Sequence, residues 1–156
     1  MIMTKTPLVI WIDADACPKK VKETVFKNSA RLNLPVRLVA NSYMNIPHSP
    51  LIRFDKVDNG DDVADRFIVD HSSPGDVAIT ADIPLASDLV NKGVHTINPR
   101  GETYTLENIS ERLSVRDFMK ELRDSGIETG GPASYGDKDI QKFTNSLNRL
   151  LTKLLK

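Results

Sequence analysis

The chain of 156 residues is poor in cysteine, with Cys17 as its only one. An internal disulfide is therefore excluded, and nothing in the cysteine usage indicates secretion. Long hydrophobic runs are also missing, since the apolar stretch before Asp13 is too short for a signal peptide or a membrane span. These absences predict a soluble cytoplasmic protein with no membrane partner. A chain of this length buries about 70% of its unfolded surface, so it is expected to fold without a disulfide or a structural metal.

The chain also has no net charge, because 21 lysines and arginines balance 21 aspartates and glutamates. A neutral chain is not a generic binder of polyanions, so contact with RNA or DNA must come from a local basic patch or from metal ions. Lys138, Lys142, Arg149 and Lys153 form a basic stripe near the C-terminus, although such a stripe is usually a solvated helix face. The sequence carries no signal for the oligomeric state.

Short apolar runs alternate with amphipathic stretches along the first two thirds of the chain. This alternation is typical of parallel βαβ units, with helices on both faces of one sheet. From about residue 106 the pattern is helical only. We therefore expect a single domain over 1–156, with an α/β core over 7–105 and a C-terminal helical extension over 106–156. The expected strands are 9–12, 36–40, 51–57, 77–80 and 94–97, and the expected helices are 18–32, about 61–73, 83–92, a segment around 113–122, and 137–155.

Aspartates stand where the chain leaves the expected strands. Asp13 and Asp15 follow the first strand, and Asp82 follows the fourth. Asp62 and Asp65 open the helix that comes after the third strand. Ligands of open parallel sheets bind outside the carboxyl ends of the strands, so all these acids lie on the side where a site is expected. If the strand order reverses beside the first strand, the first and fourth strands are neighbours, and Asp13 meets Asp82.

Each acid also has a structural alternative. Aspartate is a favoured N-cap residue worth about 1 kcal/mol, and Asp62 and Asp82 stand just before helices. Asp15 is close to the helix that Pro18 opens, where capping alone would explain it. Taken singly, capping is the simpler role for these residues. Asp13 is the exception, because it abuts four apolar strand residues and is expected to be partly buried.

Taken together, the acids indicate a metal site. Two carboxylates about 5 Å apart repel by roughly 3 kcal/mol at an effective dielectric constant near 20, so a cluster needs a cation to offset it. Oxygen ligands without a histidine or cysteine cluster favour Mg²⁺ or Mn²⁺ over zinc. Two such ions can activate a water and stabilise the leaving oxygen of a phosphodiester. The sequence therefore predicts metal-dependent hydrolysis of RNA or DNA, with Asp13, Asp62, Asp65 and Asp82 as catalytic metal ligands and Asp15 as a supporting ligand.

Four motifs carry a resemblance to a known family. They are Trp11-Ile-Asp13-Ala-Asp15-Ala-Cys17-Pro18, Asp61-Asp62-Val-Ala-Asp65, Thr80-Ala-Asp82-Ile-Pro-Leu-Ala86 and Gly130-Gly-Pro132. Together they resemble the YaiI/YqxD family of uncharacterised bacterial proteins, which is regarded as related to PIN-like nuclease domains. The resemblance implies a Rossmann-like, three-layer α/β/α fold with a five-stranded parallel sheet in the order 3-2-1-4-5. It also implies an acidic Mg²⁺ or Mn²⁺ site, formed by Asp13, Asp82 and either Asp62 or Asp65, that acts on RNA or DNA.

One departure from the PIN pattern leaves other functions open. Where many PIN domains carry a further acid near the fifth strand, this chain has Asn98 and Arg100. A catalytically silent PIN-like module that binds nucleic acid or protein is therefore one alternative. A haloacid-dehalogenase-like phosphatase is another, with Asp13 as nucleophile and Asp15 as acid/base. The acidic pair Asp61-Asp62 precedes Thr80, whereas this chemistry needs its lysine and acids downstream, which ranks the phosphatase below the nuclease.

Two further polar residues are expected to contact substrate. Asn41 ends the second strand at the same edge, where its amide suits a metal-bound water or the substrate, and Arg100 suits a phosphate. Cys17 stands one residue before a helix start but has no histidine nearby in sequence to activate it. We expect Cys17 to be a small residue beside the helix start and not a nucleophile.

Overall fold

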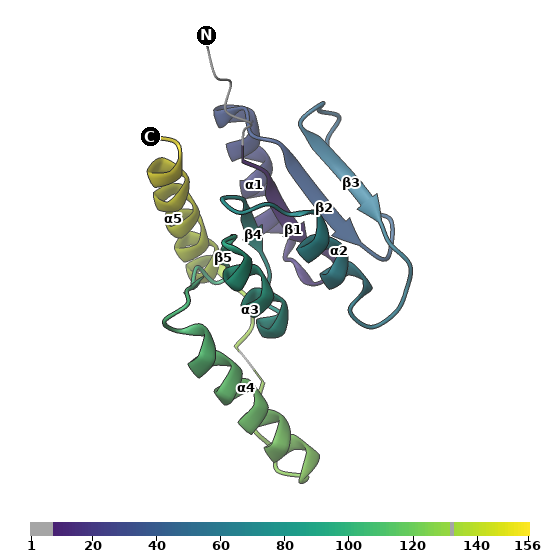
Figure 1. The fold of residues 1–156 in the computed structure, drawn as a ribbon, viewed down its shortest axis with the longest axis vertical. Helices are drawn as coiled ribbons and strands as arrows, with labels where there is room; N and C mark the ends of the chain where they lie inside the picture. The colour runs from purple at the N-terminus through teal and green to yellow at the C-terminus, as the bar shows by residue number, and fades with distance from the viewer. Residues whose placement is uncertain (1–7, 132) are drawn as a thin grey trace.

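A mixed six-stranded sheet organises the computed structural model, which describes residues 8–131 and 133–156 (Figure 1). The strand order is β3-β2-β1-β4-β5-β6. Neighbouring strands from β3 to β5 are parallel, and β6 runs antiparallel to β5. The strands are β1 (Ile10–Asp13), β2 (Val36–Ala40), β3 (Ile52–Lys56), β4 (Val77–Ile79), β5 (His95–Ile97) and β6 (Thr103–Tyr104).

The expected sheet of five strands, all parallel, is wrong in one respect. The order 3-2-1-4-5 is extended by β6, which pairs Tyr104 with Thr96 and Thr103 with Ile97. A strand of two residues has no apolar run or alternation to reveal it in the sequence, and it forms because the short loop after β5 turns the chain back. The fold is therefore α/β with a mixed sheet.

Helices cover both faces of this sheet. On one face, Val21 and Val25 of α1 and Phe143 of α5 pack against Ile10 and Ile12 of β1. On the other face, α2 and α3 pack against a second apolar cluster that includes Trp11. The helices are α1 (Lys19–Leu32), α2 (Val63–His71), α3 (Ile83–Lys92), α4 (Ile109–Asp124) and α5 (Asp137–Leu154), and a single 3-10 turn, η1 (Ala14–Ala16), follows β1.

The central strand explains why the first apolar run is continuous. Ile10 and Ile12 point into one apolar cluster and Trp11 into the other, and all three side chains are essentially inaccessible to solvent. A strand covered on both faces needs apolar side chains at successive positions, in contrast to the alternation of a half-exposed strand. β1 is hydrogen-bonded to β2 on one side and to β4 on the other, so its carboxyl end lies at the switch point of the sheet.

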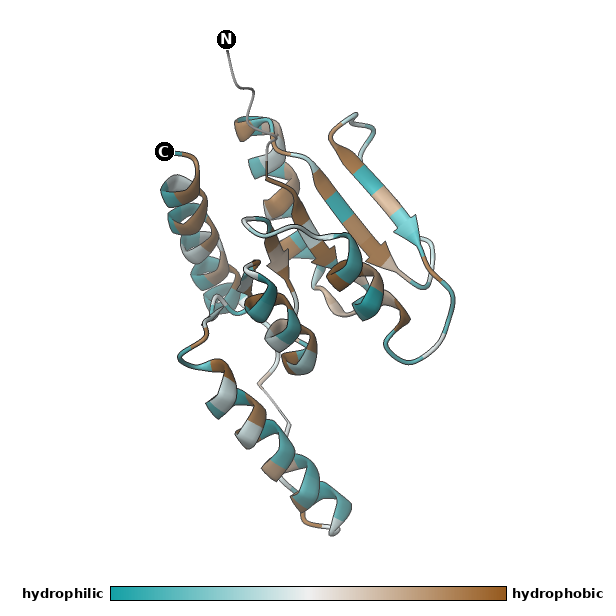
Figure 2. Ribbon diagram, viewed as in Figure 1, coloured by the Kyte–Doolittle hydropathy of each residue, from teal (hydrophilic) through white to brown (hydrophobic). Residues whose placement is uncertain are grey.

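The two C-terminal helices are placed differently. α5 lies against α1 and buries Phe143, Leu147 and Leu151 in the core. α4 packs only its first turns against α3 and extends away from the body, as its mixed hydropathy in Figure 2 allows. None of the helices in the described residues has the length and apolar character of a membrane span. Residue 7, where the expected core starts, and Pro132 of the Gly130-Gly-Pro132 motif fall outside the described residues.

Candidate functional site

Thr80 joins the carboxyl ends of the two central strands. Ile12 of β1 is paired with Ile79 of β4, so the next residues, Asp13 and Thr80, leave the sheet side by side. The buried Thr80 hydroxyl donates to Oδ2 of Asp13 over 2.8 Å and accepts the Asp82 main-chain N–H over 3.0 Å. Asp13 and Asp82 therefore meet at the switch point, as the sequence predicts.

Asp82 has a structural role in addition to its place at this edge. It is the N-cap of α3, and its Oδ1 accepts the main-chain N–H of Leu85 over 3.0 Å. Pro84 in the first turn fits a helix that begins here. The predicted capping role is thus confirmed for Asp82. The cap also fixes the carboxylate beside Thr80 and the end of β1.

Asp65, in the first turn of α2, meets the same group of acids. Its pKa is raised to about 7, first by burial and then by the negative charges of Asp82, Asp13 and Asp62. A side-chain hydrogen bond with Asp82 also favours the protonated form. Desolvation and nearby negative charges both favour the protonated form of a carboxyl, so the pKa of this half-buried side chain is raised. Three aspartates from three different elements therefore influence one another across this edge.

The pKa of Asp13 is also raised. Burial is the largest cause of its raised pKa, followed by the opposing effect of the Thr80 hydrogen bond. The charges of Asp82 and Asp15 raise the pKa as well. The hydroxyl of Thr80 thus offsets part of the cost of placing a carboxylate at the end of the buried strand.

Asp15 and Asn41 form a separate contact beside this group. Asp15 is exposed in η1 and accepts the main-chain N–H of Asn41 over 2.8 Å and the Ser42 hydroxyl over 3.5 Å. Asp15 therefore ties the loop after β2 to the turn after β1, and it does not cap α1, whose N-cap is Pro18. Asn41 takes part through its backbone, which leaves its partly buried side chain at the edge.

Asp62 lies at the start of α2 without acting as a cap. Its φ of +66° places it in the left-handed region, which few residues other than glycine adopt, and its side chain makes no capping hydrogen bond. A hollow of about 270 Å³ opens between α2 and α3, and Asp62, Asp65, Arg66 and Asp88 contribute to its wall. Aspartate is one of the few non-glycine residues that adopt this region readily, so the turn into α2 accounts for the conformation.

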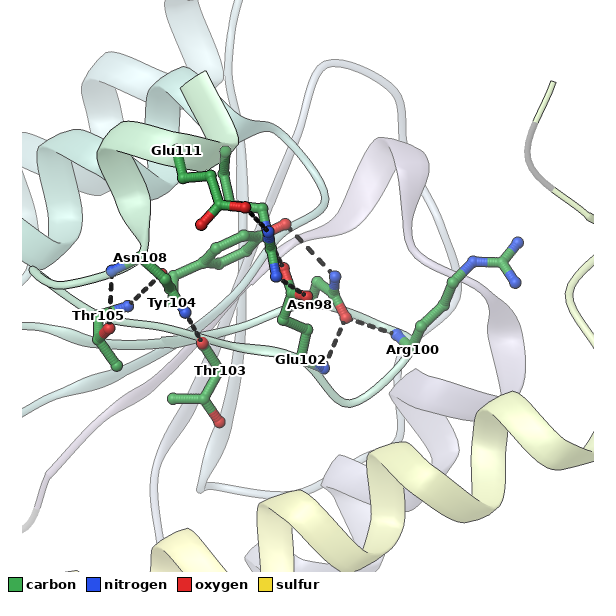
Figure 3. Close-up of polar contacts among 9 residues, drawn as sticks. Asn98, Arg100, Glu102, Thr103, Tyr104, Thr105, Asn108 and Glu111 are labelled. Carbon is green, nitrogen blue, oxygen red and sulfur yellow. Dashed lines mark hydrogen bonds and ion pairs between the residues drawn. The ribbon is translucent and has the colours of Figure 1, made fainter. Parts of the chain in front are cut away.

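Asn98 organises the loop after β5, as Figure 3 shows. Its Oδ1 accepts the main-chain N–H groups of Arg100 and Glu102, each over 2.9 Å, and its amide donates to the Tyr104 hydroxyl. Burial raises the pKa of Tyr104, and Asp82 is among the charges that raise it, so this hairpin lies near the acidic group. Asn98 therefore serves the loop that carries β6.

Arg100 is held by the segment that leads into α5. Its guanidinium pairs with Asp139 over 3.1 Å and donates to the carbonyl of Ala133. In Figure 3 its side chain points away from the Asn98 and Tyr104 contacts. The substrate role expected for Arg100 remains a prediction, and any phosphate would compete with Asp139 for this side chain.

Two contacts at this edge were not foreseen from the sequence. Glu102 forms a two-pronged ion pair with Arg112 of α4, with nitrogen–oxygen distances of 2.6 and 2.8 Å. Nothing in the local pattern marks this pair, because its partners come from a hairpin and a helix. Thr80 had a signal, its position two residues before Asp82, but its bridging bond requires the neighbouring strand.

Cys17 lies in surroundings that agree with the prediction that it is not a nucleophile. Burial raises the pKa of its thiol to about 12, and the side chain packs against the core. A thiolate is the nucleophilic form of cysteine, so this thiol is unreactive at neutral pH.

The acids do not form a preformed metal cage. Among residues 8–131 and 133–156, no group of three or more histidine, cysteine, aspartate or glutamate side chains lies close enough to enclose an ion. These residues provide carboxylate oxygens whose negative charges repel one another at the end of the central strands.

The sequence has clear relatives among known proteins. Residues 11–153 match the family described as "Uncharacterized BCR, YaiI/YqxD family". A UPF0178 protein of Maridesulfovibrio salexigens is 55% identical over 94% of this chain and 97% of its own length. UPF0178 proteins of Trichlorobacter lovleyi (52% identity, 96% and 97% of the two chains) and Shewanella baltica (50%, 93% and 97%) are also similar. No solved structure matches the chain. With a family match over most of its length and relatives that share half of its residues, the chain belongs to the YaiI/YqxD family.

Proposed function

We propose that this protein is a metal-dependent nuclease that hydrolyses phosphodiester bonds of RNA or DNA at the acidic edge of its sheet. The observation that carries the proposal is the meeting of Asp13 and Asp82 at the switch point through Thr80, and the pKa of Asp65, raised by these two charges, supports it. The parallel strands in the order β3-β2-β1-β4-β5, with acids at their carboxyl ends, also support the PIN-like resemblance.

The donor set fits Mg²⁺ or Mn²⁺. Carboxylate oxygens are hard ligands, and burial keeps the neighbouring Cys17 thiol protonated by raising its pKa to about 12. These three residues would hold the ion, with Asp62 and Asp15 in support. When bound, the ion would supply a water of lowered pKa and stabilise charge on the leaving oxygen.

Two features of the protein's own residues affect how this edge would bind a cation. Thr80 orients the Asp13 carboxylate through Oδ2 and thereby fixes one donor relative to the end of β4. Asp65 retains a proton up to about neutral pH, and this proton must leave before the carboxylate becomes a full ligand. Cation binding at pH 6.5 is therefore expected to release a proton from the protein.

Calorimetry tests this cation site directly. Titration of Mn²⁺ at pH 6.5 in two buffers with different ionisation enthalpies measures the number of protons released. We expect close to one proton for the wild type and a smaller number for Asp65→Asn. Asp70→Asn, an exposed aspartate at the far end of the same helix, is the matched control and should behave as wild type. Absence of Mn²⁺ binding at millimolar concentration would overturn the metal site.

Cleavage is tested with labelled single-stranded RNA and DNA in Mg²⁺ or Mn²⁺. Loss of a metal ligand is expected to lower activity by about 100-fold or more, so Asp82→Asn and Asp13→Asn should be nearly inactive while Asp70→Asn is active. Asparagine can still cap a helix, so Asp82→Asn is expected to fold. Cleavage that persists in Asp82→Asn would contradict the proposal.

A catalytically silent binding module is the second candidate. It is favoured by the loop after β5, where Asn98 and Arg100 are engaged in hydrogen bonds and an ion pair and supply no further acid. Metal binding without cleavage of any substrate would select this function. The phosphatase alternative is weaker, because the acidic pair Asp61-Asp62 precedes Thr80, whereas this chemistry needs its acids downstream.

A further inference from the structure

The charges of this neutral chain are sorted between its two faces. α1 and α5 contain nine of the 21 basic residues and only three of the 21 acidic ones, which gives the pair a net charge of plus six. The rest of the chain therefore carries minus six. Overall neutrality hides this separation, and electrostatic attraction of a charged partner depends on the local field and not on the net charge.

The basic residues of α5 lie along one ridge. Lys138, Lys142, Arg149 and Lys153 follow one another at spacings of four, seven and four residues, which place them on a single helix face. All four are exposed, and their ridge lies roughly opposite the buried Phe143–Leu151 side of the helix. At about 1.5 Å per residue the ridge is about 22 Å long, which matches roughly six phosphates of a stacked strand at about 3.4 Å per phosphate.

A second basic ridge lies on the neighbouring helix. Lys20, Lys27 and Arg31 of α1 are spaced seven and four residues apart, and all are exposed. α1 and α5 pack against each other, and Lys20 pairs with Asp137 over 3.2 Å where the two helices begin. We call the exposed ridges of α1 and α5 the basic layer. α1 begins shortly after η1, so the basic layer starts beside the acidic edge of the sheet.

We propose that the basic layer binds the phosphate backbone of a single-stranded nucleic acid and leads it to the acidic edge. The inference rests on the proposed function for the fate of the strand, but the binding itself needs neither metal nor turnover. The side chains between the basic residues of α5 suit a polar backbone: Gln141, Asn145, Asn148 and Thr152 are all exposed.

An anionic membrane fits this surface less well. Peripheral membrane helices insert large apolar side chains between their basic residues. The large exposed hydrophobic residues of the described chain lie outside both helices of the basic layer: Tyr43, Leu106, Val115, Phe118, Ile127 and Leu155. The layer is therefore polar throughout, as expected for contact with phosphates and sugars.

Fluorescence anisotropy with a labelled 12-nucleotide RNA tests the proposal. The measurement is made in EDTA, so that cleavage does not intervene, over a series of salt concentrations. Lys27→Glu/Arg149→Glu reverses one charge on each helix, and Lys120→Glu/Arg123→Glu makes the same charge change on exposed residues of α4. Circular dichroism and urea unfolding check that each variant is folded.

We expect the basic-layer variant to bind at least ten times more weakly than wild type. Because each phosphate contact on a single strand contributes about 0.7 to the slope of log K against log salt, loss of two contacts should reduce that slope by about 1.4. The α4 variant should bind within a factor of about three of wild type. Equal losses in the two variants, or no RNA binding by wild type in EDTA, would overturn the proposal.

The same experiment separates this proposal from the nuclease proposal. RNA binding by the wild type is measured in EDTA, and cleavage by the same protein is measured in Mg²⁺ or Mn²⁺. Normal binding without cleavage would keep the basic layer and remove the nuclease, whereas cleavage unaffected by Lys27→Glu/Arg149→Glu would keep the nuclease and remove the basic layer. Flotation with vesicles rich in phosphatidylserine provides the last control, and vesicle binding in place of RNA binding would contradict the assigned partner.

Discussion

Aspartates lie at both ends of the central strands, but their surroundings differ between the two ends. Asp76, just before β4, is 7% exposed and accepts three hydrogen bonds, from the main-chain N–H groups of Val9 and Ser73 and from Nε1 of Trp11, at 2.9 to 3.0 Å. At the other end, Asp13 and Asp65 have raised pKa values because burial and neighbouring carboxylates oppose their charge.

The difference lies in the donors that surround each carboxylate. Hydrogen bonds to a charged group stabilise it, and Asp76 uses them to fasten the start of β4 to β1. The acids at the carboxyl edge have one another as neighbours, which destabilises the folded state. Asp76, with three donors, stabilises the fold, whereas Asp13 and Asp65 lie beside other carboxylates that raise their pKa values, as is common at functional sites.

The largest effect is expected at Asp76. Asp76→Ala leaves the indole N–H of Trp11 and two main-chain N–H groups without their acceptor, and such losses cost about 3 kcal/mol. Urea unfolding at pH 7 measures the change, with Asp70→Ala, an exposed aspartate of α2, as the matched control. A loss below about 1 kcal/mol, equal to that of a surface site, would mean that Asp76 does not fasten these strands.

A smaller effect is expected at Thr80, where a single donor supports the acidic edge. Thr80→Val keeps the shape but removes the hydroxyl that Asp13 accepts, so the free energy of unfolding should fall by about 1–2 kcal/mol at pH 7. The pKa of Asp13 should rise further, because this hydrogen bond lowers it. Carboxyl ¹³C titration by NMR follows the pKa, with Thr80→Ser as the variant that restores the donor. An unchanged pKa in Thr80→Val would contradict this role.

The part of the site that depends on strand order could be predicted from the sequence. Asp13 and Asp82 each end a buried apolar run, and the topological rule for parallel sheets then brings them together. The role of Asp76, just before β4, could not be predicted from the sequence. It depends on hydrogen bonds from Trp11 and Val9, which are distant in sequence. Contacts between residues 65 positions apart leave no local pattern.

The prediction of helices from the sequence was also limited to local patterns. α4 and α5 were both predicted from their apolar periodicity, and both are helices. Phe143 of α5 is fully buried, whereas Phe118 and Val115 of α4 are 58% and 52% exposed. Periodicity predicts that a helix has an apolar side, but the surface against which that side packs belongs to the rest of the chain. β6 was missed for the related reason that its two residues are defined only by their partner β5.

The smallest and most specific effect is expected from Asp65 in its pH dependence. Because its pKa is raised to about 7 in the folded state, the folded protein retains a proton between about pH 4 and 7 that the unfolded chain has lost. In EDTA, this carboxyl therefore contributes stability at the acidic end of the window, and the contribution is lost as the pH rises toward 7. Solvent screens a half-buried carboxyl, so the change should stay below about 1 kcal/mol.

The free energy of unfolding of wild type and of Asp65→Asn is measured at pH 5, 6, 7 and 8. Asp65→Asn should lack the decline in this free energy with pH, while Asp70→Asn should retain it. Parallel curves for wild type and Asp65→Asn would show that Asp65 is satisfied in the folded state as Asp76 is, and the contrast between the two ends of the sheet would fail. Addition of Mn²⁺ sharpens the contrast, because a cation that replaces the proton should stabilise the wild type most above pH 7 and Asp65→Asn much less.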